Sequence, residues 1–579
     1  MYHSDRFQID IQEAKKKLKE ICNSKAVKLY GTDLPEVVKN RLELELSAIV
    51  KNHFESQYLL GALLAEQSKS AGFSVTTRGT IGSSFVAYLC GITNVNPLPA
   101  HRYCPHCHHF ELASEKNNYR VMGYDLPVKD CPKCGARLVA SGADIQPVIA
   151  MGLNLDQAPA LILNVAREIR ADLINYLKTL FGEDSVFRAS VKVEREDGFV
   201  NRGVHPGRLF IVPKEADISE VTALREPDPT DESNLPITEE DYIKLDGILF
   251  GIDLLTLPEL SFLHFLEEET GINSDSDQIR YDDPLIMKSF VEDELLLLPE
   301  NTREEIAPQI ANTAKEYRPK CFSDFVRLSM MIYAPWKESK DSTVNTGKQL
   351  AESITSRDDI FQYLLEKGLD KEAAYSAFRS KEISKELKHT LKSSGVEDGF
   401  IQFLEEKEYL FPKSHATEYT ILAWKLAYYR LYHPEAYVER RIISIENSLH
   451  QPQEFVMMEH EHHVVLQAYC SKDVERVDNI PAAINGKPVT TVDVQAFVMH
   501  KEIRELILPD SITDIEAHAF RDCTGLKRIV LPRNLKNLHP CAFSFCYLNN
   551  AEIVLPEGWE DIEVSDRFIT GEYSLKKRS

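Results

Sequence analysis

Four cysteines, arranged as two closely spaced pairs, are the residues whose spacing points most directly to metal chemistry. Two residues separate Cys104 from Cys107, and two separate Cys131 from Cys134. Four thiolates presented by two tight turns make a closed tetrahedral shell, for which zinc is the usual ion. A proline lies inside each pair and Gly135 follows the second pair. We predict a structural zinc site, because such a shell leaves no coordination position open for a reaction.

Three histidines beside the first pair could replace one of the thiolates as a ligand. They are His106, His108 and His109. Because four thiolates already complete the shell, we expect the histidines to stay outside it. The alternative is four thiols without a metal. A second histidine group, at 460–463, is interpreted as a solvated polar stretch rather than a metal site.

A glycine-rich turn after a short strand-like run has residue types suited to phosphate binding. Gly79 and Gly82 let backbone NH groups approach an anion, and Ser83 and Ser84 add hydroxyl donors. The start of an apolar helix at Phe85 adds a favourable dipole. The pattern is not a Walker motif, because no Gly-Lys-Ser/Thr follows it. By itself it also fits an ordinary strand-to-helix turn.

The elements that must position these residues follow from the apolar patterns along the chain. Residues 8–70 have a helical pattern, and 73–77 form a strand-like run that enters the glycine turn. A loop-rich insert at 97–150 holds the cysteine pairs, and 209–213 indicates a buried strand. From 254 to about 445 the pattern is helical again.

The end of the chain repeats every 23 residues. Ala-Phe pairs begin at 496, 519 and 542, and Leu-Pro pairs recur with nearly the same period. Each unit carries an Ile/Leu-rich strand, so the pattern is similar to BspA-like leucine-rich repeats, with about three units between 484 and 560. Stacked repeats usually offer a protein-binding face, and the alternative is a folding cap.

Several motifs, in order, resemble the PolC-type DNA polymerase III alpha subunit. Besides the cysteine pairs they are residues 77–87, 91–99, 123–127, 181–189, 205–207, 357–359 and 411–416. The resemblance covers roughly residues 25–445 with gaps, and it implies a nucleotidyltransferase palm with helical fingers. It further implies a structural zinc site and a triphosphate cradle, with nucleotide or template facing the fingers. The residues of the implied cradle are Arg78, Gly79, Gly82, Ser83 and Ser84, and those of the fingers are Lys413 and His415.

The sequence differs from the family at the positions of the catalytic carboxylates. The resemblance implies three aspartates that hold two magnesium ions, but Ala160 and Ile162 stand at two of these positions. For the third we prefer Asp253 to Asp246, because Asp246 requires a seven-residue insertion. One carboxylate cannot hold both ions, so we expect magnesium to be lost.

Composition limits the partners that the chain can have. A length of 579 residues is enough for several globular domains, and a content of 43% hydrophobic and 27% charged residues is ordinary for globular proteins. The net charge of −23 disfavours DNA, whose affinity rests on Lys and Arg at phosphates. An odd count of 11 cysteines suits a reducing compartment, and we find neither a signal core nor a membrane-length apolar run. We therefore expect a cytoplasmic protein that has no membrane partner.

The predicted fold class is α+β, a PolC-like palm with helical fingers, followed by a short β-rich solenoid. The palm is assigned to 1–260 with a zinc-knuckle insert at 101–140, the fingers to 261–448, a linker to 449–483 and the repeats to 484–579.

The predicted function is that of a catalytically inactive PolC-like homologue, which binds a protein partner through its repeats in a replication-related role. One alternative is a DNA- or nucleotide-binding module that keeps the palm's grip. The other is an active DNA-directed DNA polymerase.

Overall fold

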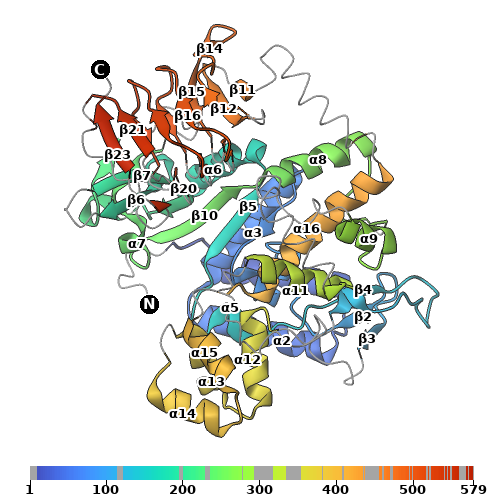
Figure 1. The fold of residues 1–579 in the computed structure, drawn as a ribbon. Helices are drawn as coiled ribbons and strands as arrows, with labels where there is room; N and C mark the ends of the chain where they lie inside the picture. The colour runs from blue at the N-terminus through green and yellow to red at the C-terminus, as the bar shows by residue number, and fades with distance from the viewer. Residues whose placement is uncertain are drawn as a thin grey trace. The chain divides into compact units, whose positions relative to one another are not determined.

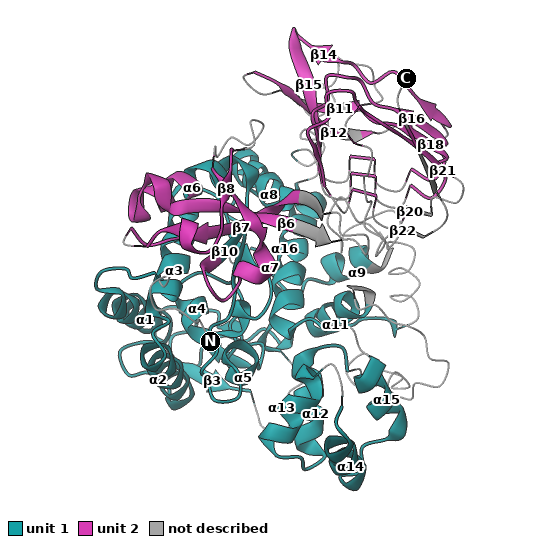
Figure 2. Cartoon of the chain, turned by 90° about the vertical axis from the view of Figure 1, so that its left-hand side faces the viewer, with its two compact units in different colours: residues 1, 9–173, 252–436 teal, residues 2–8, 174–251, 437–579 magenta. Residues whose placement is uncertain are grey.

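The computed structural model divides the chain into two compact units (Figure 2). Unit 1 contains residues 9–173 and 252–436, and unit 2 contains 174–251 and 437–579. The structure describes residues 9–113, 122–194, 200–214, 216–227, 235–276, 278–292, 317–333, 354–380, 383–406, 410–433, 436, 455–459, 462–469, 474–493, 496–497, 500–516, 519–520, 523–539, 542–543, 546–547, 551–557, 559, 569–570 and 573–577. Within these ranges no helix is both long enough and apolar enough to cross a bilayer.

Unit 1 begins with three helices, as the helical pattern of the first seventy residues predicts (Figure 1). They are α1 (Ala14–Tyr30), α2 (Glu36–Lys51) and α3 (Glu55–Ser70). α1 buries a single stripe with a four-residue spacing, Leu18, Cys22, Ala26 and Tyr30. α3 is buried over most of its surface, which explains its unbroken apolar run.

Three strands of unit 1 carry the candidate palm residues. β1 (Thr76–Thr77) pairs antiparallel with β5 (Leu161–Val165), and β5 pairs parallel with β10 (Phe250–Thr256). Each of the two parallel strands runs into a helix, α6 (Arg167–Phe181) after β5 and α8 (Pro258–Thr270) after β10. The glycine turn after β1 contains η2 (Ile81–Ser83) and opens the short helix α4 (Phe85–Leu89).

The cysteine insert forms a small antiparallel sheet in the order β3-β2-β4. Its strands are β2 (His101–Tyr103), β3 (Phe110–Leu112) and β4 (Val139–Ser141), and the 3-10 turn η3 (Gly123–Asp125) and the helix α5 (Pro147–Met151) flank β4 in sequence. This confirms a loop-rich insert with little regular structure.

The described residues in the rest of unit 1 are mainly helical, as predicted. Its helices are α9 (Pro284–Glu292), α11 (Phe322–Tyr333), α12 (Arg357–Glu366), α13 (Lys371–Arg379), α14 (Lys385–Ser393), α15 (Asp398–Glu406) and α16 (Lys413–Tyr432). α16 begins directly after Pro412, whose fixed φ suits a helix start. Its Trp424 is fully buried against the rings of Phe290, Phe322 and Phe325. These aromatic contacts join α9 and α11 to α16.

The first part of unit 2 is a small sheet in the order β7-β6-β9-β8. Its strands are β6 (Val186–Glu194), β7 (Val200–Ile211), β8 (Leu224–Arg225) and β9 (Ile237–Asp241), accompanied by η4 (Glu183–Ser185), η5 (Ile218–Glu220) and α7 (Tyr242–Leu245). The buried strand predicted at 209–213 is the end of β7, where Leu209, Phe210 and Ile211 are fully buried.

The repeats of unit 2 stack two parallel ladders around one core. One ladder is β15-β17-β19 and the other is β13-β16-β18-β21-β23. Phe497, Phe520 and Phe543, spaced by 23 residues, stack with centroids 5.6 and 4.9 Å apart. The strands are β14 (Ala483–Ile484), β15 (Lys487–Val492), β16 (Glu505–Ile507), β17 (Asp514–Ile515), β18 (Arg528–Val530), β19 (Asn537–Leu538), β20 (Cys546–Tyr547), β21 (Ala551–Leu555), β22 (Ile569–Thr570) and β23 (Tyr573–Lys577).

The segment assigned to a linker, 449–483, contains strands that belong to the repeat sheets. β11 (Phe455–Glu459) pairs with β12 (Val464–Tyr469), and β12 pairs with β15. β13 (Arg476–Val477) pairs with β16. The sequence did not reveal them, because these strands lack the 23-residue signature of the later units.

Candidate functional site

Asp253 and Ile162 are direct partners across the parallel strands β10 and β5. In such a pair the two side chains lie on the same face of the sheet. Ile162 is half-buried there, and Asp253 is 8% exposed. Ala160 is exposed immediately before β5. The fold therefore brings the predicted third carboxylate, Asp253, level with one of the two apolar residues.

Asp246, the other candidate for the third carboxylate, has a different environment within unit 2. Its Oδ1 accepts a hydrogen bond from Nη2 of Arg208 at 2.7 Å, and its side chain is half exposed. It lies after α7 and outside β10, so it does not share the strand position of Asp253.

The first half of the glycine turn packs against Ile162. The backbone NH of Arg78 donates to the carbonyl oxygen of Ile162 at 3.3 Å. Gly79 has a φ of +71°, a region that favours glycine. A Cβ added to Gly79 would lie 3.6 Å from Cδ1 of Ile162. The turn and the substituted palm position are thus in contact.

The two serines of the turn have their hydroxyls engaged inside the protein. Both Ser83 and Ser84 are fully buried. The Oγ of Ser83 lies 2.8 Å from the Oγ of Ser414 on α16. The Oγ of Ser84 donates to Glu45 at 2.6 Å and caps α4 by accepting from the NH of Ala87. Both side chains therefore hold the turn against its neighbours.

Glu45 on α2 is a site residue that sequence reasoning missed. Its carboxylate is fully buried and accepts from the NH groups of Phe85 and Val86, at 3.0 and 3.1 Å. The Nε of Arg41 donates to the same carboxylate at 2.5 Å. The NH groups at the start of α4, whose helix dipole we expected to favour a phosphate, are thus already paired with an anion of the protein. In the sequence, Arg41 and Glu45 show only the ordinary i, i+4 spacing of a helical ion pair.

Arg78 and His415 come together beside the turn. The Arg78 guanidinium lies 5.8 Å from the centroid of the Tyr419 ring, and its Nε is buried without a hydrogen-bond partner. His415 stacks on Phe411 with centroids 4.6 Å apart. Burial, and secondarily the charge of Arg78, lowers the pKa of His415 to about 3. The imidazole is therefore neutral at physiological pH.

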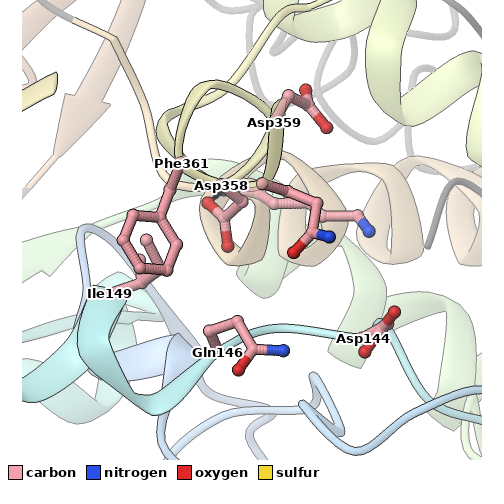
Figure 3. Close-up of a pocket in the computed structure, with 8 residues that line it drawn as sticks. Asp144, Gln146, Ile149, Asp358, Asp359 and Phe361 are labelled. Atoms are coloured by element: carbon pink, nitrogen blue, oxygen red, sulfur yellow. Dashed lines mark hydrogen bonds between the residues drawn. The ribbon is translucent and has the colours of Figure 1, made fainter. Parts of the chain in front are cut away.

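Lys413, predicted to act with His415, lies elsewhere. It is 4% exposed, and its Nζ donates to the carbonyl oxygen of Ala143 at 2.7 Å. Residues two positions apart on a helix point about 200° apart, so Lys413 and His415 do not share a side. Lys413 instead lines a pocket of 20 Å³ (Figure 3), room for about one water molecule. The other lining residues are Asp144, Gln146, Ile149, Asp358, Asp359, Phe361 and Gln362.

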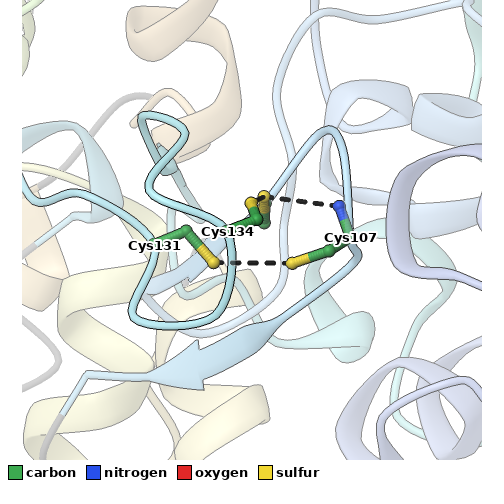
Figure 4. A group of neighbouring side chains, drawn as sticks. Cys107, Cys131 and Cys134 are labelled. Atoms are coloured by element: carbon green, nitrogen blue, oxygen red, sulfur yellow. Dashed lines mark hydrogen bonds between the residues drawn. The ribbon is translucent and has the colours of Figure 1, made fainter.

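The four cysteines converge as their spacing predicts (Figure 4). Their Sγ atoms all lie within 4.8 Å of one another, with Cys104–Cys134 at 3.4 Å and Cys107–Cys131 at 3.5 Å. A tetrahedral zinc with bonds of about 2.3 Å places its sulfurs about 3.8 Å apart, so the cluster fits this ion. In the described part of the chain it is the one cluster of potential ligands that suits a metal.

Two of the neighbouring histidines make contacts away from the sulfurs. The Nδ1 of His108 lies 3.4 Å from the carbonyl oxygen of Leu29, and the Nε2 of His109 lies 2.9 Å from Oε1 of Glu111. Neither belongs to the sulfur cluster, in agreement with the prediction that they are not ligands. Of the second histidine group, His460 lies outside the described residues, while His462 is exposed.

Comparison with protein-family models matches two separate regions of the chain. The family model of the bacterial DNA polymerase III alpha NTPase domain matches residues 16–197. The model of the BspA type leucine rich repeat region, in six copies, matches residues 484–566. The second match agrees with the repeats predicted from the 23-residue period, although the number of copies is larger than the three that we counted.

The relatives named DNA polymerase III PolC-type include proteins of Caldanaerobacter subterraneus subsp. tengcongensis and Thermotoga maritima. The first is 32% identical over 476 residues, which cover 74% of this chain and 34% of the relative. The second is 31% identical over 477 residues, 73% of this chain and 34% of the relative. The chain thus spans about a third of the length of these relatives.

Two solved leucine-rich repeat proteins are also similar. A protein from Bacteroides capillosus is 20% identical with a TM-score of 0.19, covering 22% of this chain and 97% of that structure. One from T. pallidum is 18% identical with a TM-score of 0.15, covering 22% and 86%. Together with the family matches, the sequence relatives lead to one conclusion: the chain joins a domain of the PolC-type DNA polymerase III alpha family to a C-terminal region of BspA-type leucine-rich repeats.

Proposed function

We propose that this chain is a PolC-like scaffold without polymerase chemistry, which acts by binding a protein partner through its repeats in a replication-related role. The observation that carries this proposal is the pair Ala160 and Ile162, where the family resemblance implies metal-binding aspartates. The partnership of Ile162 with Asp253 supports the assignment of these positions.

The chemical argument rests on the metals that phosphoryl transfer needs. Two ions activate the attacking hydroxyl and neutralise charge on the leaving group, and carboxylates must hold them. Alanine and isoleucine carry no ligand atom, so Asp253 would stand alone. We therefore propose that magnesium-dependent synthesis has been lost with the two carboxylates.

Primer extension with the pure full-length protein tests this proposal. We expect no extension with magnesium or manganese, and the same result for Asp253→Asn. Extension that Asp253→Asn abolishes would establish the alternative, an active DNA-directed DNA polymerase, which the names of the relatives favour. The matched variant is needed because it separates activity of this chain from a contaminating polymerase.

For the repeats we propose a protein-binding role, since stacked repeats usually present a continuous surface to a partner. Because β11 to β13 pair with the repeat strands, we also propose that the repeat region starts near Phe455 rather than at 484. We expect a pull-down with the full chain to capture the partner, and a pull-down with a chain ending before Phe455 not to capture it. An unchanged set of captured proteins would contradict the role given to the repeats.

The second candidate function is DNA or nucleotide binding, which the Arg78–His415 environment favours. The predicted fingers also carry a basic stripe, formed by Arg379, Lys381, Lys385, Lys388 and Lys392. This stripe does not add to the case, because Lys388 is paired with Glu405 at 2.8 Å and Lys392 with Asp398 at 2.6 Å. Lys381 of the same stripe lies outside the described residues. Fluorescence anisotropy titration with primer-template DNA, at low and at moderate salt, tests whether the chain binds DNA. Saturable, salt-sensitive binding that Arg78→Gln weakens would favour this candidate.

A further inference from the structure

Two thiols face each other in unit 1, away from the metal cluster. Cys22 lies on α1 and is fully buried, and Cys90 is the residue that ends α4 and is 8% exposed. Their Sγ atoms are 3.6 Å apart. A disulfide requires about 2.05 Å. The pair would close through a movement of about 1.5 Å shared by two side chains, the difference between these two distances.

Other buried thiols have a different kind of partner. Cys523 and Cys546 each donate to a backbone carbonyl oxygen at 2.9 Å. Cys22 and Cys90, by contrast, are 68 residues apart in the sequence, and each has the other's sulfur within contact distance. The packing of α1 on α4 produces this juxtaposition.

We propose that Cys22 and Cys90 are an oxidation site, which a small organic disulfide converts into an intramolecular disulfide that ties α1 to the end of α4. Ser84, in the glycine turn that lies beside Ile162, caps the start of α4. The bond would therefore fasten the short helix that the turn opens. This inference does not depend on the proposed function.

The reaction balances with the small disulfide as the oxidant. The thiolate of one cysteine attacks a sulfur of the small disulfide, whose S–S bond breaks and releases one small thiol. The second cysteine then attacks the mixed disulfide, releases the second small thiol and forms the Cys22–Cys90 bond. The protein gives up two electrons, the small disulfide takes them, and the two protein protons end on the two released thiols.

The environment of Cys22 and Cys90 affects how fast they can be oxidised. The hydrogen bond with Cys22 and burial raise the pKa of Cys90 well above its usual value. Because the thiolate is the attacking species, oxidation should be slow at neutral pH and faster as the pH rises.

Peptide mapping of the full-length, zinc-loaded protein tests the proposal. The protein is incubated with 2-hydroxyethyl disulfide, its free thiols are alkylated, and it is digested with trypsin without reduction. We expect residues 20–25 joined to residues 79–102, two hydrogens lighter than the sum of the two thiol peptides. A parallel reaction with the free thiol N-acetylcysteine reports that the reagent is active.

The same peptide map also defines the result that would contradict the proposed disulfide. Recovery of both peptides only as alkylated thiols or separate mixed disulfides, while the reagent oxidises N-acetylcysteine in the parallel reaction, would overturn the proposal. As a second measurement, the melting temperature of the oxidised wild type should rise and should return on treatment with dithiothreitol. Cys22→Ser and Cys90→Ser should not show this shift. If either variant fails to fold, the wild-type peptide map still decides.

Discussion

Ile162 on β5 and Asp253 on β10 are cross-strand partners in a parallel pair, and the glycine turn lies against Ile162. The position at which the family resemblance implies a carboxylate is therefore held level with Asp253. On the proposed assignment, the strands of a palm are in place while two of its three metal-binding side chains are replaced. The first prediction follows from it.

Restoring the carboxylates should restore a cation site. The double variant Ala160→Asp and Ile162→Asp places new carboxylates beside Asp253, and oxygen ligands are those that manganese and magnesium prefer. We expect manganese binding by the double variant and none by the wild type, measured by isothermal titration or electron paramagnetic resonance. Adding Asp253→Asn to the double variant should weaken the binding at least tenfold. Equal binding by the wild type would contradict the prediction.

Removing the carboxylate of Glu45 should destabilise unit 1 strongly. Glu45→Ala leaves the Arg41 guanidinium without its carboxylate partner. It also leaves the backbone NH groups of Phe85 and Val86, at the start of α4, without their hydrogen-bond acceptor. The loss of one partner from a buried ion pair costs about 3–5 kcal/mol. Urea unfolding measures this, and Glu43→Ala, on the exposed side of the same helix, is the matched control with an expected change within about 0.5 kcal/mol. A similar small loss for both variants would show that Glu45 does not hold the turn.

Asp358 should make stability fall as the pH rises. Burial raises its pKa from 3.8 to about 6, and the nearby Lys413 opposes this shift. A group whose pKa is higher in the folded state stabilises the fold below its unfolded pKa, and this contribution is lost as the pH rises through the folded pKa. The window is therefore about pH 4 to 6, and the change is on the order of 3 kcal/mol.

The variant Asp358→Asn removes this titration. We expect the difference in unfolding free energy between pH 5 and pH 7.5 to shrink relative to the wild type, measured by urea unfolding at both values. Asp370→Asn, at the exposed start of α13, is a control outside the pocket. An unchanged pH dependence in Asp358→Asn would contradict the assignment of the shift to this residue.

The sulfur cluster should hold zinc at about one ion per chain. Elemental analysis of the purified protein measures the ratio, and Cys131→Ser, which removes one of the two buried sulfurs, should lower it. Cys321→Ser is the control, because Cys321 lies outside the cluster. A folded protein without metal, or equal zinc in Cys131→Ser, would contradict the prediction.

The features that the sequence by itself determined are local or periodic. The Cys-x2-Cys spacing specifies two tight turns, and the 23-residue period specifies stacked units with Phe497, Phe520 and Phe543 in one core. The helical pattern from residue 8 onward is also set by neighbours three and four positions away. Each of these signals is contained within a short stretch of chain.

Contacts between distant segments were decided only by the tertiary structure. Nothing in the sequence near Glu45 shows that it reaches the start of α4, 40 residues later. Lys413 and His415 are neighbours in the sequence, yet the helix turns them toward different surroundings, one a small acidic pocket and the other Arg78. The sequence register already favoured Asp253 over Asp246, but only the pairing of β10 with β5 shows that Asp253 lies opposite Ile162. Pairing and burial depend on the packing of whole elements, so residue type and spacing could propose these roles but the three-dimensional contacts had to assign them.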